Sequence, residues 1–242
     1  MYRTGLAVEV AQGISEAQGT RITRRRVGKA YVTDIRVSDS GAGVIGRPAG
    51  RYITIESEPD EHALRMVFQK ALELLLPREG VILVAGLGNP DITRDSLGSE
   101  SISRLTAVCG RRTMCVMETD IAAKTGIETA RMVSAVADEI NASCVLAVDA
   151  LACKDPMKIG RTVQITNTGI QPGSGVCSDS PALTETFVGV PVVAVGVPTV
   201  SELSGISGNA GHKGFLISPP DEDLRVRSWA EVIAGGINSI FR

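Results

Sequence analysis

Two aspartates follow aliphatic runs of the chain, where we expect a buried strand to end and a loop to begin. Asp149 comes directly after the run "CVLAV" at 144–148, and Asp95 lies in "GLGNPDITRDSLG" at 86–98, which follows the run "VILVA". Two carboxylates at close range cannot both ionise, so one acts as a base toward water while the other donates its proton to a carbonyl oxygen. Such a pair is sufficient for hydrolysis of a peptide bond.

Each aspartate also has a structural explanation. A carboxylate at the end of an apolar strand needs a partner, a proton or a metal, but Asp149 could equally cap a helix or bond a neighbouring loop. Asp95 precedes "SLGSESISRL", where an aspartate is a good helix N-cap. A metal held by the pair is a further alternative, although no histidine follows either run and HExxH spacing is absent. The sequence predicts no metal and no cofactor.

Glycine-rich segments supply the remaining candidate site residues. "GLGNPDIT" lacks the third glycine of the dinucleotide fingerprint at the required position, so a nucleotide site is weakly indicated at most. "TNTGIQPGSG" at 166–175 has backbone N–H groups that could cradle a peptide or an anion, with a plain turn as the alternative. In open parallel sheets such loops meet at the carboxyl ends of the strands.

The periodicity of apolar residues predicts the elements that position these loops. Helical spacing is found over 60–76, 127–140 and 225–241, and a further helix is expected after Asp95. Short aliphatic strands are expected at 81–85, 113–117, 144–148, 161–166 and 192–196. Alternation of strand and helix predicts a mostly parallel central sheet with right-handed crossovers, and therefore a three-layer α/β fold.

The first 60 residues have a different pattern. Residues 5–10, 31–37 and 51–56 alternate apolar with polar side chains, as strands do. We expect one peptidase domain over 1–242, with a β-rich N-terminal elaboration over 1–60 and the parallel-sheet core over 80–200.

Composition limits the classes of function. The chain of 242 residues is 43% hydrophobic and only 3% aromatic, and its formal net charge is -2. These values argue against direct nucleic-acid binding, and no apolar stretch is long enough for a membrane span. Arg21, Arg24, Arg25 and Arg26 form one basic cluster, which fits a solvated strand edge or an acidic partner. Five cysteines without a CxxC pair indicate neither a disulfide framework nor a thiolate zinc site. A cytoplasmic protein is expected.

Seven ordered blocks resemble the germination protease family of spore-forming bacteria. The resemblance covers nearly the whole chain up to about residue 205. The blocks are "RTGLAVE" (3–9), "VIGRPAGRYITIE" (44–56), "GLGNPDITRDSLG" (86–98), "KTGIETA" (124–130), "AVDALA" (147–152), "TNTGIQPGSG" (166–175) and "GVPVVAVGVPTV" (189–200).

The resemblance implies an endopeptidase that degrades small acid-soluble spore proteins at germination. It also implies a homotetramer in the spore core and a fold of the phosphorylase and hydrogenase-maturation-peptidase type. The family's two proposed catalytic aspartates match Asp95 and Asp149, without the metal-binding histidine of the hydrogenase-maturation relatives. Residues expected to line the substrate cleft are Gly88, Asn89, Arg94, Thr168, Gly169 and Ser174. Because the family cleaves after glutamate, Arg94, Lys124 and Arg131 are candidates for a cationic pocket.

Three departures from the family pattern qualify these expectations. Gly5 and Asn167 stand where the family has aspartates, the chain begins near the start of a processed enzyme, and "SGNAGHKGFLISPP" replaces a longer C-terminal region. Alternatives are therefore a metal-dependent peptidase of the hydrogenase-maturation type and a catalytically silent spore protein that binds acidic partners.

Overall fold

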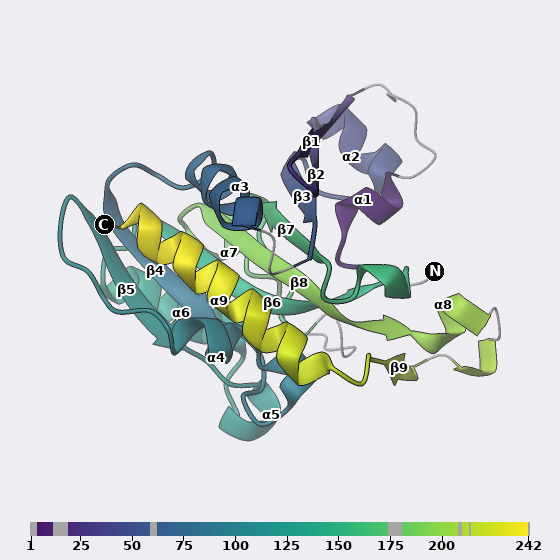
Figure 1. The fold of residues 1–242 in the computed structure, drawn as a ribbon. Helices are drawn as coiled ribbons and strands as arrows, with labels where there is room; N and C mark the ends of the chain where they lie inside the picture. Colours follow the sequence, from purple (N-terminus) through teal and green to yellow (C-terminus); the bar gives the residue numbers. More distant parts are fainter. Residues whose placement is uncertain are drawn as a thin grey trace.

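A single mixed sheet crosses the whole molecule in the computed structural model, which describes residues 4–11, 19–58, 62–173, 181–207, 210–212 and 214–241. Within these residues the strands follow the order β1-β2-β3-β7-β8-β6-β4-β5, and β9 pairs with β8 (Figure 1). The strands are β1 (Thr20–Val27), β2 (Ala30–Val37), β3 (Gly50–Glu56), β4 (Gly80–Gly86), β5 (Arg112–Glu118), β6 (Cys144–Cys153), β7 (Thr162–Thr166), β8 (Val192–Glu202) and β9 (Leu216–Ile217).

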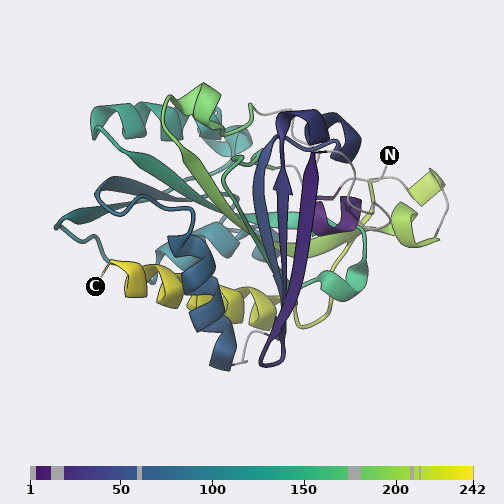
Figure 2. The ribbon, with the colours of Figure 1, turned by 90° about the horizontal axis from the view of Figure 1, so that it is seen from above.

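Helices cover both faces of the sheet, which confirms the predicted three-layer α/β class. Figure 2 shows α3 (His62–Glu73) and α9 (Glu222–Ile240) below the sheet, and α6 (Thr129–Glu139) and α7 (Glu185–Val188) above it. The other helices are α1 (Ala7–Val10), α2 (Asp39–Ile45), α4 (Leu97–Ile102), α5 (Ala122–Thr125) and α8 (Leu203–Ser207). Short 3-10 turns span Thr93–Asp95, Pro156–Lys158 and Ala210–His212.

The core follows from the apolar periodicity. Leu64, Phe68 and Leu72 recur at helical spacing on α3 and pack with α9 against the sheet. Trp229, the only tryptophan, is fully buried on α9, and its indole donates to the carbonyl of Gly160 at 2.7 Å. On the opposite face, Val133 and Ala137 of α6 pack against β4 and β6. Burial on both faces explains why the central strands are continuous aliphatic runs.

Strand direction divides the sheet into two parts. β5, β4, β6 and β8 are mutually parallel, as the alternation of strands and helices predicts. β7 joins β8 antiparallel, and β3, β2 and β1 continue the antiparallel pairing. The β-rich N-terminal region therefore extends the same sheet. The assignment of 1–242 to one domain stays a prediction, which this continuity favours.

The prediction of a strand at 5–10 was wrong, because these residues form a loop and the short helix α1. They bind the sheet through isolated contacts instead of a ladder. Gly5 N donates to Ala152 O at 2.8 Å, and Ala7 N donates to the side-chain oxygen of Gln164 at 2.6 Å. The Glu9 carboxylate accepts the backbone amides of residues 154 and 155. Alternating apolar residues here pack on the sheet without joining it.

Candidate active site

Asp149 lies inside a central strand. The parallel pairing of β6 with β8 continues from Asp149 to Cys153, so the expectation that the strand ends at Asp149 was wrong. Pairing with β4 on the other side does stop at Val148, because the chain leaves the sheet after Gly86. Asp149 is thus level with the carboxyl end of β4, where the following loop passes it.

The Asp149 carboxyl group is almost completely removed from solvent. The residue is 1% exposed, and Oδ1 accepts the Ala150 amide at 2.9 Å. Oδ2 is buried and has no hydrogen-bond partner in the described part of the chain. Burial, with the nearby charge of Asp95, raises the pKa of Asp149 well above its usual value, and the Ala150 and Gly173 amides oppose this shift. The protonated form of this group is therefore favoured more than it is in an exposed aspartate.

The loop after β4 brings Asp95 to the same place. Leu87 N donates to Val148 O at 2.8 Å, so this loop runs directly beside Asp149. Asp95 ends the 3-10 turn Thr93–Asp95, and its Oδ2 accepts the Asn89 amide at 2.7 Å. Ser96 is the N-cap residue of α4, so Asp95 does not cap this helix. Burial also raises the pKa of Asp95, against the Asn89 amide and the Arg94 charge, which lower it.

Gly88 makes this close approach possible. Its φ is +106°, a conformation that favours glycine, and a Cβ built on it would lie 2.1 Å from the carbonyl oxygen of Asp95. The predicted site residues Gly88, Asn89 and Asp95 therefore form one tight loop. Its glycine is required by the distance between two backbone segments.

Two contacts that the sequence did not indicate fix the far side of this loop. Thr199, a buried residue of β8, donates its hydroxyl to the carbonyl of Arg94 at 2.6 Å. The Arg94 side chain is exposed. Lys124 forms ion pairs of 2.6 Å with both Asp91 and Asp120, so its charge is already matched by two carboxylates. The sequence gives no sign that Thr199, a threonine in an apolar strand, holds a loop through its hydroxyl group instead of only filling the core.

A cleft of about 600 Å³ opens beside β6 and β8, although neither Asp95 nor Asp149 is among the residues that line it. Gly196, which pairs in register with Asp149, lines it together with Leu151. The predicted residues Thr168 and Gly169 line its other side, where the Thr168 hydroxyl lies 3.0 Å from that of Thr166. Ser174 lies outside the described residues. The cleft therefore lies between the glycine-rich segment that begins at 166 and β6, the strand that carries Asp149.

Tyr52 is a cleft residue that sequence reasoning missed. It lies on β3, donates its hydroxyl to Pro48 O at 2.8 Å and lines the cleft. Burial raises the pKa of its phenol, which therefore stays a neutral donor. The alternation of 51–56 predicts that this side chain faces inward but not that a cleft opens beside it.

Of Gly5 and Asn167, the two positions where the family pattern has aspartates, only Gly5 is among the residues that line the cleft. Gly5 lines it, and a Cβ at Gly5 would meet the Leu151 side chain at 3.0 Å. The Asn167 side chain accepts the Arg51 amide at 2.8 Å, a role in which an amide oxygen and a carboxylate are equivalent. The loss of the charge at 167 therefore leaves the local backbone supported.

The arrangement suits acid–base chemistry. Two carboxyl groups of unequal burial lie near enough for the charge of Asp95 to act on Asp149, and the described residues contain no group of three or more side chains suited to holding a metal ion. His212 contacts Ser207 at 2.9 Å in the segment after β8, and neither residue lines the cleft. The described helices include none that is long and apolar enough to cross a bilayer.

The raised pKa of Asp149 predicts a specific pH dependence of stability. Above the unfolded pKa of about 3.9, the unfolded chain has released this proton while the folded chain still holds it, so the free energy of unfolding falls as pH rises toward the folded pKa. Asp149→Asn cannot ionise and escapes this fall. Urea unfolding from about pH 4 to pH 8 should show the stability difference moving in favour of the variant.

Asp138→Asn is the matched control, because Asp138 is exposed on α6. Its stability difference from the wild type should change much less over the same range. A difference that is equally constant with pH in both variants would mean that Asp149 is ionised in the folded protein.

The chain is similar to proteins of one known family. The family model described as germination protease matches residues 6–212. Germination proteases of Clostridium tetani, Clostridium perfringens and Priestia megaterium are 33%, 33% and 30% identical over 85%, 74% and 85% of this chain. The matched regions span 72%, 62% and 65% of those relatives, which is about two thirds of their length.

A [NiFe] hydrogenase maturation protease from Thermococcus kodakarensis aligns with 69% of this chain and 99% of its own, at a TM-score of 0.44 and 19% identity.

Proposed function

The chain belongs to the germination protease family, and from this premise we propose that it is an endopeptidase that cleaves small acid-soluble spore proteins during germination. The observation that carries the proposal is the buried carboxyl group of Asp149, whose Oδ2 has no partner in the described residues and which Asp95 influences electrostatically. A deeply buried polar atom without a partner is costly, and a substrate group or a water molecule would supply the missing bond.

The two carboxyl groups take different roles in this proposal. Asp149, the more buried of the two, carries the shared proton and donates it to the carbonyl oxygen of the scissile bond. Asp95 is ionised and accepts a proton from the attacking water molecule. The Asn89 amide, which donates to the Asp95 carboxylate, holds Asp95 in position. As the bond between carbon and nitrogen breaks, Asp95 passes the proton taken from water to the leaving nitrogen, and the hydroxyl group formed from the carbonyl oxygen returns its proton to Asp149. This division follows from burial, since both pKa values are raised and that of Asp149 is raised more strongly.

The loop after β4 and the cleft together supply the substrate-binding residues of the proposal. We expect Gly88 and Asn89 to contact an extended peptide beside Asp95, and Thr168 and Gly169, which line the cleft, to contact it further along. Ser174 belongs to the same proposal through the resemblance alone. Arg94 is the preferred cation for a glutamate side chain, because Lys124 is already paired with two carboxylates. Arg131 is exposed on α6.

The family resemblance extends the proposal to assembly and location. We expect one peptidase domain that forms a homotetramer in the spore core, without a cofactor and without direct contact to nucleic acid.

Cleavage of a small acid-soluble spore protein by the purified chain tests the function, with and without a chelator. We expect cutting after glutamate that the chelator leaves unchanged, and mass spectrometry of the fragments measures it. Arg94→Ala should broaden the residue preference, while Arg227→Ala, an exposed position on α9, should not. Activity lost on chelation and restored by nickel or zinc would favour the metal-dependent peptidase instead. Binding without turnover would favour a silent binding protein.

A further inference from the structure

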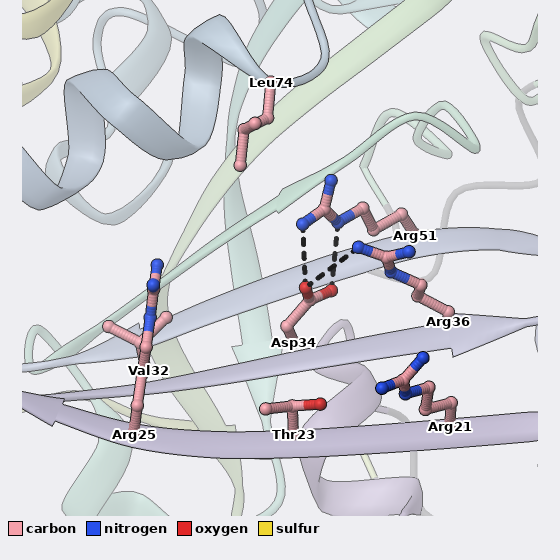
Figure 3. A pocket seen from close by; sticks show the side chains of 8 residues that line it. All are labelled: Arg21, Thr23, Arg25, Val32, Asp34, Arg36, Arg51 and Leu74. Atoms are coloured by element: carbon pink, nitrogen blue, oxygen red, sulfur yellow. Dashed lines mark hydrogen bonds and ion pairs between the residues drawn. The ribbon is translucent and has the colours of Figure 1, made fainter.

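A hollow lined by arginines lies on the outer part of the sheet, between the strands β1 to β3 and the end of α3. We call it the arginine hollow. Its volume is about 270 Å³, and its lining residues, drawn in Figure 3, are Arg21, Thr23, Arg25, Val32, Asp34, Arg36, Arg51 and Leu74. Four cations surround a single carboxylate, in a chain whose formal net charge is -2. The positive charge here is therefore local.

The register of the strands places three arginines in one row. Arg21 of β1 pairs with Arg36 of β2, and Arg36 pairs with Arg51 of β3. Like charges directly opposite each other on neighbouring strands, about 4.8 Å apart, destabilise a sheet. Asp34 offsets only part of this repulsion, because its carboxylate accepts two bonds from Arg51, at 2.7 and 3.0 Å, and lies 3.9 Å from Arg36.

Arg21 and Arg25 keep their charges available. Both are exposed on β1, and neither forms an ion pair within the described part of the chain. Charges on an edge strand also discourage unwanted strand pairing, which would account for arginines on either face of β1. Protection of an edge strand does not account for Arg36 and Arg51, because these residues belong to inner strands and face the same hollow.

The hollow continues into a second groove. Arg25 and Leu74 line both, and the second groove, of about 1100 Å³, adds Lys70, Arg78 and Arg111 to the basic surface. Arg111 is paired with Glu79, but the groove as a whole remains rich in cations. A single small anion would need only the arginine hollow. The continuous basic surface instead fits a segment of chain that carries several negative charges.

We propose that the arginine hollow binds an acidic peptide segment of a protein partner, with glutamate or aspartate carboxylates on the row of arginines. Guanidinium groups bind carboxylates through paired hydrogen bonds, as Arg51 does with Asp34. The exposed side chain of Leu74 adds an apolar surface for the methylene groups of glutamate. No aromatic side chain lines the arginine hollow, so the hollow has no surface on which nucleobases could stack, which disfavours single-stranded nucleic acid.

This surface is separate from the candidate active site. Val32, Ile53 and Ile55 share the face of the arginine hollow and pack in the core cluster that includes Val148 and Ala150. Because successive side chains of a strand point to opposite faces, Asp149 lies on the other side of the sheet. The proposal therefore stands independently of the proteolytic function.

Fluorescence anisotropy with a labelled short polyglutamate peptide tests the proposal on the full chain. Arg21→Gln with Arg25→Gln should weaken binding by about tenfold at low salt. The matched control is Arg24→Gln with Arg26→Gln, which removes two arginines from the same strand on the opposite face and should leave binding nearly unchanged. Arg36→Gln, a single substitution at an exposed side chain on β2, should weaken binding in the same direction.

Three further arms exclude other occupants. A polyglutamine peptide should not bind, inorganic phosphate should compete weakly, and Asp149→Asn should bind polyglutamate like the wild type. Equal weakening by both double substitutions, or no binding by the wild type, would overturn the proposal. Tighter binding of a short DNA duplex than of polyglutamate would overturn it in favour of a nucleic-acid surface.

Discussion

Replacing Asp149 by asparagine is expected to lower the rate of peptide cleavage on the order of 10³-fold while the protein stays folded. Asparagine keeps the shape of the side chain and its contact with the Ala150 amide, but it cannot deliver a proton to the substrate carbonyl. Single-turnover cleavage of a spore protein, followed by mass spectrometry, measures the loss. Asp138→Asn on the surface of α6 should retain the wild-type rate.

The partner carboxylate gives this prediction a second arm. Asp95→Asn should cause a loss of similar size, and the double variant should lose little more than either single variant, because two groups that act as a unit are not additive. Independent, multiplying losses would mean that the carboxylates do not act on one reaction step. Wild-type cleavage by Asp149→Asn would remove this residue from the mechanism.

The second large effect is expected at Gly88, where a single methyl group should disturb the site. In Gly88→Ala the new Cβ would overlap the Asp95 carbonyl, and the φ of +106° would be strained for alanine. We expect a destabilisation of about 3 kcal/mol by urea unfolding, together with a fall in cleavage of about 100-fold, because the loop must move Asp95 to relieve the overlap.

Gly189→Ala is the control that separates the effect of backbone strain from the effect of a Cβ that overlaps a neighbouring atom. Gly189 has a φ of +88°, and nothing lies within 4 Å of a Cβ built there. This variant should lose about 1 kcal/mol of stability from strain and retain its activity. If Gly88→Ala were no worse than Gly189→Ala, the close approach of Gly88 to Asp95 would not determine the geometry of the loop.

The local pattern of the chain predicted the elements of the core well. Aliphatic runs at 81–85 and 144–148 are strands because they are buried on both faces, and the apolar spacing of 60–76 and 127–140 placed α3 and α6. The arginine cluster was expected as a strand edge or a surface for an acidic partner, and it does lie on the edge strand β1.

What the sequence did not predict depends on partners distant in the chain. Asp149 lies in the middle of β6 because β8 continues beside it. The local sequence predicted the end of the strand here, because a charged residue interrupts the apolar run. Residues 5–10 alternate like a strand, yet contacts with Gln164 and Ala152 fix them as a loop and helix. Thr199 and Tyr52 contact the loop and the cleft because of where β8 and β3 lie in the sheet, which the local sequence does not indicate.

The two carboxylates differ in how firmly the fold holds them. Asp149 belongs to a strand buried over its whole length, so its amide should exchange hydrogen with solvent only when the whole protein unfolds. Asp95 lies on one 3-10 turn, which is held by local bonds such as that from Asp95 N to Ile92 O, by the Asn89 amide on the Asp95 carboxylate and by the Thr199 hydroxyl on Arg94 O; a short turn of this kind is expected to open locally. We therefore expect the two carboxyl groups to separate while the sheet stays intact, so that activity is lost under mild denaturing conditions before the fold is lost.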